Sequence, residues 1–161
     1  MQTKKETVSI FVQNQANVLT RVVSLFGRRG YNIDSLTVSA TNDPEISRIT
    51  IVFNVTDASL KQIITQTEKL EVVREIFVLE SENSVYRELL LVKVATTAQN
   101  RCQIKDVVDI YRGKIISLSR ESIIIELTGN SDKIDSILKV LSDYEILDIS
   151  RTGTTGMSRE N

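Results

Sequence analysis

Hydrophobic and polar residues alternate along the first half of the chain with two different periods. Apolar side chains at every second position are typical of half-buried strands, and an unbroken apolar run is typical of a buried strand. Such stretches occur at residues 7–12, 35–40, 49–55 and 72–79. Apolar side chains recur at helical spacing at residues 18–26 and 60–64. The predicted order is βαββαβ, the ferredoxin-like arrangement of an α+β domain.

Turn and capping residues separate these elements. The polar residues 14–17 predict a turn before the first helix, and Gly30 predicts a left-handed cap after it. Residues 41–45, which include Pro44, predict a turn between the second and third strands. Asp57 is the predicted N-cap of the second helix.

The second half of the chain repeats the same order of elements. A polar linker at residues 80–84 leads into strands that we expect at residues 88–96, 115–118, 123–127 and 144–149. Helices are expected at residues 104–111, ended by Gly113, and from a capping Ser131 to Leu141. The repeated order predicts two ferredoxin-like domains, residues 1–80 and 85–161.

The composition of the C-terminal tail differs from that of the two domains. Residues 151–161 are rich in Gly, Ser and Thr, which predicts a disordered tail. Contact with a partner protein through residues 157–159 is the alternative.

The first strand has no internal Lys or Pro that would blunt an exposed sheet edge. Because such edges need cover, we expect the chain to pair with a second copy as a homodimer.

The charge balance excludes several classes of partner. The 161 residues include 20 Lys or Arg and 21 Asp or Glu, which gives a net charge of −1. No field of one sign is present to attract nucleic acid or an acidic membrane, so we expect neither as a partner. No stretch reaches the ~18 consecutive apolar residues of a membrane span.

The supply of catalytic and metal-binding side chains is small. The chain has no histidine and one cysteine, Cys102, so a thiolate zinc site cannot form. We therefore expect no catalytic residue and no metal site in this chain. A single cysteine and an N-terminus without the apolar core of a signal peptide indicate a cytoplasmic protein.

An enzyme is the first alternative function. Asp106 and Asp109 lie three residues apart on a predicted helix, and such a pair performs acid–base catalysis only in a desolvated cleft. The solvated face of an amphipathic helix explains both carboxylates more simply. Cys102 stands beside Arg101 but is more simply an incidental thiol.

An RNA-binding module is the second alternative, because RNA-recognition motifs share this topology. Those motifs need exposed aromatic residues on the central strands and a basic sheet. The third strand offers Phe53 alone, and the charge of the chain is balanced. A shared fold cannot assign this function by itself.

The turn before the first helix is the candidate ligand site. Helix N-termini leave backbone N–H groups unpaired and carry partial positive charge, so they can hold a carboxylate. The backbone groups here belong to Asn17, Val18, Leu19 and Thr20. The Asn14 amide lies beside them, and Asn32 at the start of the second strand can meet an ammonium group. The alternative is that Asn14 and Asn17 merely shape the turn and cap the helix.

Several longer motifs resemble one protein family. Residues 14–22 (N-x-x-N-V-L-x-R-V) resemble the amino-acid-binding signature of ACT domains. Residues 28–38 (RRGYNIDSLTV) and 43–51 (DP-x-x-SR-x-TI) are similar to the small subunit of acetolactate synthase. The second half is similar to the C-terminal domain of that family at residues 87–94, 111–116 and 156–159. The resemblance covers nearly the whole chain and identifies the first domain as an ACT domain.

The resemblance implies a regulatory chain that is not itself an enzyme. The small subunit of this family binds a large catalytic subunit that uses thiamine diphosphate. Magnesium and FAD are expected on that large subunit as well, and no cofactor is expected in this chain. The small subunit raises the activity of the large one and imparts feedback inhibition by valine or another branched-chain amino acid. The reaction, a condensation of two 2-oxo acids, is the first common step of branched-chain amino acid biosynthesis.

The resemblance also implies where the effector binds. In the family, two ACT domains pair side by side and the effector lies at their interface. One protomer of a homodimer would supply Asn14, Asn17, Val18, Leu19 and Thr20. The other protomer would supply Asn32 and Ile33.

One departure from the family pattern lies in this site. The family usually has glycine where this chain has Asn17, and asparagine is the next residue best able to adopt the left-handed conformation. A stand-alone amino-acid sensor, or an activator without feedback, is therefore the alternative function.

Residues 41–48 are either a solvated turn or a docking surface for the catalytic subunit.

Overall fold

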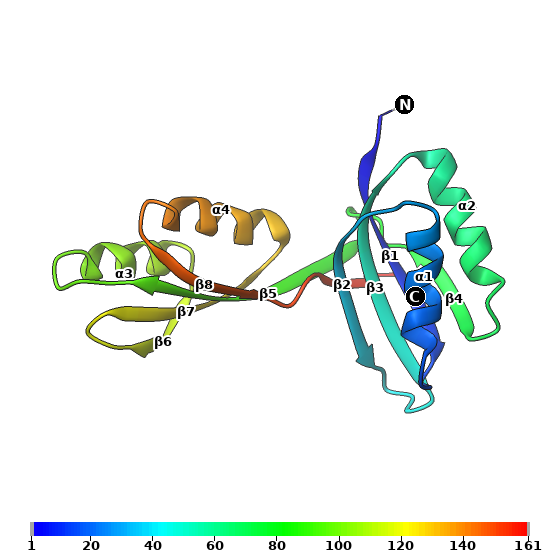
Figure 1. Ribbon diagram of the computed structural model, residues 1–161, viewed down its shortest axis with the longest axis horizontal. Helices are drawn as coiled ribbons and strands as arrows, with labels where there is room; N and C mark the ends of the chain where they lie inside the picture. The colour runs from blue at the N-terminus through cyan, green and yellow to red at the C-terminus, as the bar shows by residue number, and fades with distance from the viewer. Residues whose placement is uncertain (1, 161) are drawn as a thin grey trace. The chain divides into compact units, whose positions relative to one another are not determined.

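The computed structural model describes residues 2–160 and divides the chain into two compact units. The first unit is Met1–Val85 together with Thr154–Asn161, and the second is Tyr86–Gly153. The sequence placed residues 154–161 in the second domain, whereas the described residues 154–160 belong to the first unit. The order of elements within each unit can be followed along the coloured ribbon (Figure 1).

The first unit has the predicted βαββαβ order. Its elements are β1 (Lys4–Gln13), α1 (Val18–Arg28), β2 (Ile33–Ala40), β3 (Ile46–Val55), α2 (Asp57–Glu68) and β4 (Val73–Val78). The strands form an antiparallel sheet in the order β2-β3-β1-β4. The α+β prediction is confirmed for this unit.

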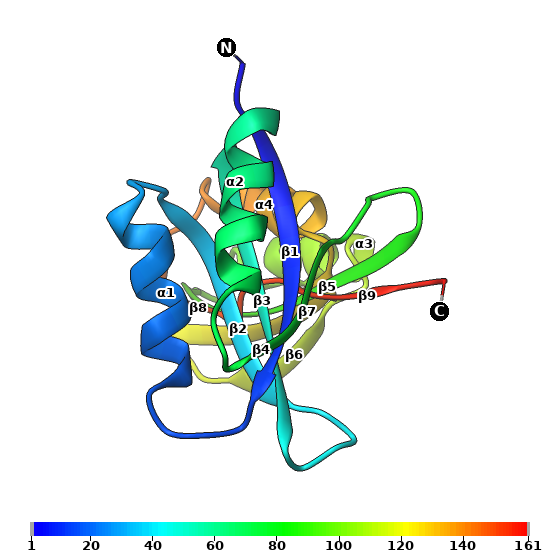
Figure 2. The same cartoon turned by 90° about the vertical axis from the view of Figure 1, so that its right-hand side faces the viewer.

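One face of this sheet forms the core of the first unit. β1 and β3 pair at its centre, from Lys4 opposite Val55 to Gln13 opposite Ile46. Alternate side chains of a strand point to the same face, and those facing the helices are buried: Val8, Ile10, Val12, Ile49, Ile51, Phe53 and Val55. α1 and α2 lie over this face (Figure 2). α1 places Val18, Val22 and Phe26, four residues apart, against the sheet.

The second unit repeats the arrangement around a core of its own. Its elements are β5 (Ser84–Ala95), α3 (Arg101–Ile110), β6 (Lys114–Leu118), β7 (Ser122–Gly129), α4 (Ser131–Leu141) and β8 (Ile146–Arg151). The antiparallel strand order β6-β7-β5-β8 corresponds to that of the first sheet. Leu90, Val92 and Val94 of β5 pack with Ile104 of α3 and Ile134 of α4. The prediction of a second ferredoxin-like domain is confirmed.

Two helix N-caps lie one residue earlier than predicted. Thr56, rather than Asp57, caps α2, because its hydroxyl accepts a hydrogen bond from the backbone N–H of Ser59. Asn130, rather than Ser131, caps α4 by accepting from the N–H of Lys133 at 3.0 Å. In each case two adjacent residues were suitable caps, and the residue in extended conformation became the cap.

The two glycines after the first helix of each unit serve different purposes. Gly30 adopts the left-handed conformation with φ 74°, as predicted. After α3 the left-handed residue is Arg112, with φ 58°, one residue before the Gly113 that was expected to end this helix. At Gly113 a Cβ would come within 3.2 Å of both the Glu126 carbonyl oxygen and Val108 Cγ1. Gly113 is therefore favoured by close packing.

The inference that the first strand is an exposed edge was wrong. β1 is an inner strand that pairs with β3 on one side and with β4 on the other. The edges of the first sheet are β2 and β4. The sequence pattern identified a strand with one apolar face, but the pattern alone does not reveal which neighbours that strand has. The homodimer consequently needs support other than an unprotected β1.

The prediction of a disordered tail was also wrong. Residues Thr155–Ser158 form a short strand, β9, which pairs with β5. Thr154 and Gly156 are buried in the first unit. A composition rich in Gly, Ser and Thr suits a segment that bonds through its backbone and packs closely, and it is therefore no proof of disorder.

The second unit contains an ion pair whose carboxylate is buried. Glu88 in β5 is only 5% exposed, and Arg151 at the end of β8 donates to it through Nε and through Nη2, the latter over 3.1 Å. Ser131 Oγ donates to the same carboxylate at 3.3 Å. The hydrogen bonds to Glu88 and then to Asp135 raise the pKa of Arg151, which keeps the guanidinium charged.

We predict that Arg151→Met destabilises the second unit by about 2–3 kcal/mol. The substitution keeps the aliphatic stem but leaves the Glu88 carboxylate buried without its counterion, which costs several kcal/mol where solvent is excluded. The predicted loss is smaller than for a fully buried pair because 32% of the Arg151 side chain is exposed to solvent. Hydrogen exchange of the β5 and β7 amides measures the stability of this unit separately.

Lys105→Met is the matched control for this prediction. Lys105 pairs with Asp109 on α3, and both side chains are 59% exposed, so solvent screens the pair and the loss of Lys105 should leave the stability of this unit nearly unchanged. Adding Glu88→Gln to Arg151→Met should recover part of the lost stability, because the buried charge is then removed. A double variant no more stable than Arg151→Met would contradict the explanation.

Candidate functional site

The N-terminus of α1 has no side-chain cap. Asn17 is at the N-cap position in the left-handed conformation, with φ 68° and ψ −1°, and its side chain makes no capping hydrogen bond. The backbone N–H of Arg21 closes the first helical bond to the Asn17 carbonyl at 3.1 Å. No acidic residue lies in the first turn. The partial positive charge of this helix end is therefore not neutralised by a nearby carboxylate of the first turn.

The conformation of Asn17 limits the residue types that this position can hold without strain. Positive φ is costly for most side chains, least so for asparagine, and costs glycine nothing. Asn17 is exposed, so its side chain projects from the turn without being used by the fold. The expectation that Asn17 can stand in for glycine agrees with this backbone. The alternative in which the Asn17 side chain caps α1 is contradicted, because that side chain makes no capping hydrogen bond.

Asn14 has a structural role that the sequence did not reveal. Its backbone N–H donates to the Glu45 carbonyl at 2.8 Å, and its side-chain amide donates to the Pro44 carbonyl at 2.9 Å. Both bonds tie the turn before α1 to the loop between β2 and β3. The two candidate regions of the sequence are thus neighbours at one end of the first sheet.

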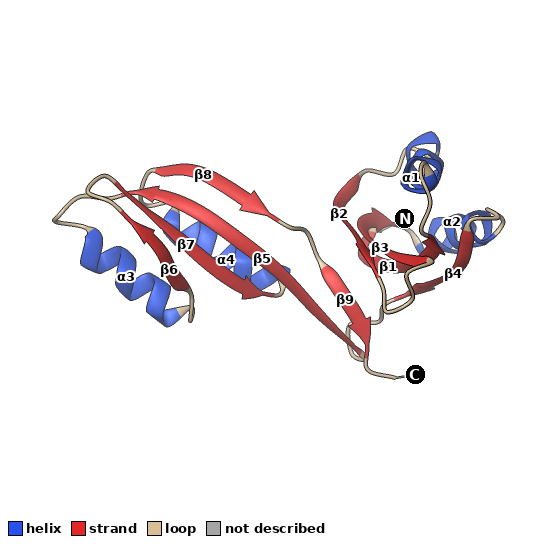
Figure 3. Cartoon of the chain, turned by 90° about the horizontal axis from the view of Figure 1, so that it is seen from below, coloured by secondary structure: helices blue, strands red, loops and turns tan. Residues whose placement is uncertain are grey.

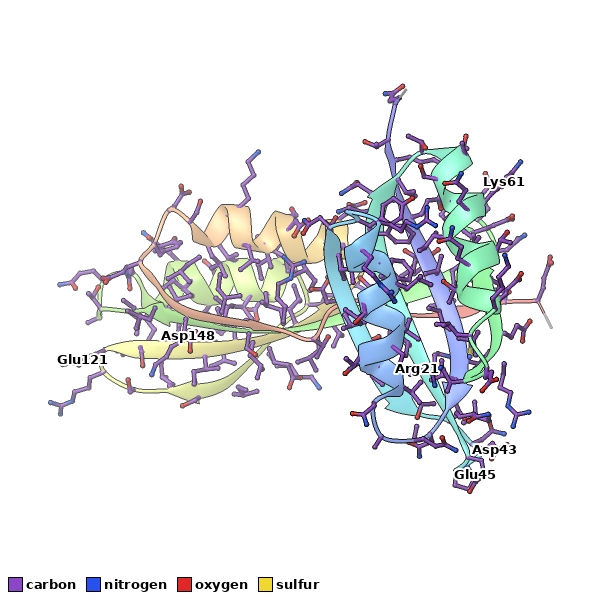
Figure 4. The ribbon with its side chains drawn as sticks, turned by 45° about the vertical axis from the view of Figure 1, so that its right-hand side comes forward. Arg21, Asp43, Glu45, Lys61, Glu121 and Asp148 are labelled. Atoms are coloured by element: carbon purple, nitrogen blue, oxygen red, sulfur yellow. The ribbon has the colours of Figure 1, made fainter. Side chains whose placement is uncertain are left out.

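The loop between β2 and β3 has its own internal order. Thr41 Oγ1 donates to the Ile46 carbonyl at 2.9 Å, and Asp43 Oδ1 accepts from the Glu45 N–H at 2.9 Å. Asp43 and Glu45 are exposed at the tip of the loop (Figure 4). The loop presents carboxylates on a fixed backbone, which suits a docking surface as well as a solvated turn.

Asn32 and Ile33 lie at the other end of α1 from Asn17. α1 has 11 residues, and at 1.5 Å per residue it separates its two ends by about 16 Å. Figure 2 shows the chain entering α1 at one end of the sheet and entering β2 at the opposite end. The structure thus brings Asn14 and residues 17–20 together at one end of α1. Within one chain, Asn32 and Ile33 lie apart from them, at the other end of the helix.

The residues behind the two alternative functions do not assemble into a site. Asp109 pairs with Lys105 on the exposed face of α3, and Cys102 is exposed on the same helix. Among residues 2–160 there is no group of three or more Cys, Asp or Glu side chains placed to hold a metal. Phe53, on which the RNA-binding alternative rested, is buried in the core. No helix in the described part of the chain has the length and apolarity to cross a membrane.

Comparison with protein families matches both halves of the chain. Residues 8–75 match the family described as AHAS small subunit-like ACT domain. Residues 87–160 match the family described as small subunit of acetolactate synthase. The second match includes β9, so the strand that packs with the first unit is part of the family pattern of the second half.

Individual relatives extend over almost the full length. The chain is 45% identical over 157 residues to the acetolactate synthase small subunit of Mycolicibacterium smegmatis, covering 98% of this chain and 92% of that protein. It is 41% identical over 158 residues to the probable acetolactate synthase small subunit of Archaeoglobus fulgidus, covering 98% of each chain.

A solved structure agrees with the fold in detail. The crystal structure of the acetolactate synthase small subunit from Thermotoga maritima is 38% identical and superposes with a TM-score of 0.90, covering 98% of this chain and 99% of that one. Agreement in sequence and in structure extends over nearly the whole chain. The chain therefore belongs to the acetolactate synthase small-subunit family, with an ACT domain in its first half.

Proposed function

We propose that this chain activates a thiamine-diphosphate-dependent acetolactate synthase catalytic subunit and confers feedback inhibition by valine. Family membership supports the subunit assignment. The single observation that supports effector binding is the uncapped N-terminus of α1, where Asn17 turns the chain without using its side chain. The Asn14 side chain joins the turn before α1 to the loop between β2 and β3, so both exposed candidate regions lie at one end of the ACT sheet.

Valine presents a carboxylate, an ammonium group and a small apolar side chain. The carboxylate suits the backbone N–H groups at the start of α1, because that helix end carries partial positive charge and no competing acidic side chain. Leu19 in the first turn is 38% exposed and offers an apolar contact for the isopropyl group. The Asn32 side-chain oxygen is a suitable acceptor for the ammonium group.

A second copy of the chain is needed to complete this site. Asn32 lies a helix length away from Asn17 in the same chain, so the two cannot contact one small molecule there. A homodimer in which β2 of one ACT domain approaches α1 of another brings the two groups together. β2 is an edge strand of its sheet and is available for such pairing.

Regulation then follows from linkage. A ligand shared by two protomers stabilises the arrangement of the pair that it fits, and it shifts the population only as far as its affinities for the two arrangements differ. A coupling of ~1–3 kcal/mol produces a fivefold to hundredfold change in effector response. An activator that lacks feedback, or a stand-alone sensor, is the alternative, because Asn17 stands where glycine is usual.

Calorimetric titration of valine into the isolated chain is the direct test, with leucine and isoleucine as comparisons. Saturable heat is expected for valine. Absence of heat for all three amino acids would contradict an effector site formed by this chain alone and would favour the activator without feedback.

We predict that Asn32→Ala raises the valine concentration for half-inhibition of the reconstituted holoenzyme about tenfold or more, because a hydrogen bond to a charged ammonium group is lost. Activation without valine should stay the same, because Asn32 is exposed and outside both cores. Gln103→Ala removes an exposed amide from α3 and is the control. Unchanged valine sensitivity in Asn32→Ala would show that the site assignment is wrong.

Asn17→Gly should bind valine severalfold more tightly than the natural chain. Glycine adopts the same positive φ without strain, and its substitution removes a side chain that the fold does not use and that projects beside the proposed carboxylate position. Titration of the isolated variant measures the effect. Unchanged or weaker binding would mean that Asn17 contributes to the site or does not touch it, in either case contradicting obstruction by Asn17.

A further inference from the structure

On the face of the first sheet that α1 and α2 leave open, buried hydroxyl groups lie beside apolar side chains such as Val52 and Phe11. Ser9 of β1, Thr50 of β3 and Thr37 of β2 are direct cross-strand neighbours on this face. Ser9 is 0% exposed and Thr50 is 1% exposed. Arg48 projects from the same face, two residues before Thr50. Another segment of the first unit must therefore cover these hydroxyls.

Residues 154–159 lie along this face and bond to side chains of β2 and β3, and we call them the strap. Figure 3 shows β9 on the side of the sheet away from α1 and α2. The Thr154 N–H donates to Ser35 Oγ at 2.7 Å, and Thr37 Oγ1 donates to the Thr154 carbonyl at 3.2 Å. Arg48 Nη1 donates to the Gly156 carbonyl at 2.8 Å. The strap thus crosses from β2 to β3 above Thr50.

Polar contacts with the strap backbone hold it in place. Arg48 is positioned for its contact by stacking over Phe11, with the guanidinium carbon 4.7 Å from the ring centre. At the far end the Arg159 N–H donates to the Asn83 carbonyl at 2.7 Å. The largest apolar side chain of the strap, Met157, is 62% exposed and adds little burial. The docked strap therefore depends on a few hydrogen bonds and a four-residue strand.

Docking the strap also has an unfavourable consequence. Ser9 Oγ and Thr50 Oγ1 are buried and have no hydrogen-bond partner within the described part of the chain. Burying a hydroxyl without a partner loses its hydrogen bonds to water, and native proteins seldom leave such groups unexplained. Thr50 lies beside the strap partner Thr37, so undocking the strap would return at least the Thr50 hydroxyl to water. The hydrogen bonds of Thr37 and Arg48 favour docking, whereas the burial of unpartnered hydroxyls on the same face opposes it.

We propose that the strap is a releasable latch on the open face of the ACT sheet, held marginally because it seals in Ser9 and Thr50. Native segments with few apolar contacts open locally at low free energy, and such segments serve as conformational switches. The strap follows β8 of the second unit directly in the chain.

The latch also shares a strand with the proposed effector site. β2 begins at Ile33 and carries both strap partners, Ser35 and Thr37. A ligand that orders the start of β2 would favour the docked strap, and a tighter strap would by reciprocity favour the ligand. This coupling rests on the proposed function, whereas the latch itself does not.

Two identical substitutions on neighbouring strands test the latch in opposite directions. Thr37→Val removes a hydrogen bond to the strap and should lower the hydrogen-exchange protection of the strap amides about fivefold to tenfold. Thr50→Val removes a buried hydroxyl that has no partner and should raise that protection by a similar factor. Both variants keep the volume and the β-branched shape, so the sheet should fold normally. The experiment uses the full chain without any ligand.

Arg48→Met provides an independent loosening variant, because it removes the bond to Gly156 and retains a side chain over Phe11. Its strap amides should lose protection while the β1 and β3 core amides keep theirs. Equal shifts in the same direction for Thr37→Val and Thr50→Val, or no shift in either, would overturn the proposal. Loss of core protection in Arg48→Met would assign that residue to the fold instead of the latch.

Valine inhibition of the reconstituted holoenzyme tests the coupling separately. Thr50→Val should lower the valine concentration for half-inhibition, and Thr37→Val should raise it. Opposite exchange shifts with unchanged valine response would retain the latch and remove the coupling. A natural chain that does not respond to valine would overturn the proposed feedback, and the exchange result of the latch would still stand.

Discussion

The antiparallel pairing of β1 with β3 is the constraint on which the first unit depends. Its register buries Ile10 with Ile49 against the helices, and it places Ser9 beside Thr50 on the opposite face. A slip of one residue would exchange the two faces and put hydroxyls into the core. The same register brings Gln13 opposite Ile46, so the turn before α1 and the loop before β3 emerge at one end of the sheet. The hydrogen bond from Asn14 to Pro44 follows from that placement.

The length of α1 determines how an effector site can be built on this frame. α1 must cross the sheet to bury Val18, Val22 and Phe26, and in crossing it carries the chain from one end of the sheet to the other. A small amino acid cannot span that distance. A site that uses both ends of α1 therefore needs two copies, which makes ligand binding and subunit pairing parts of one equilibrium. The requirement follows from helix geometry and does not depend on an exposed β1.

Periodicity predicted the elements of both units well, because one-sided burial imposes a period of two on strands and 3.6 on helices. It could not predict neighbours: β1 was taken for an edge, and its true position depends on pairing between residues distant in sequence. At the site, the positive φ of Asn17 could be anticipated from residue type, whereas the Asn14 bond to Pro44 could not. Residues 154–159 were misjudged because composition reports side chains, and this segment bonds mainly through its backbone.

The open face of the ACT sheet shows why a polar surface need not be a solvent-exposed one. Ser35, Thr37 and Arg48 are suited to hold another strand's backbone, and an apolar face would hold it more firmly but without ready release. Thr50 adds a hydroxyl where valine would fit and would strengthen docking. A face tuned for permanent packing would lack that hydroxyl. The Thr50 hydroxyl weakens the docking of the short strand β9, and a weakly docked strand can be released. The same sheet carries α1, whose N-terminus is suited to bind an amino acid.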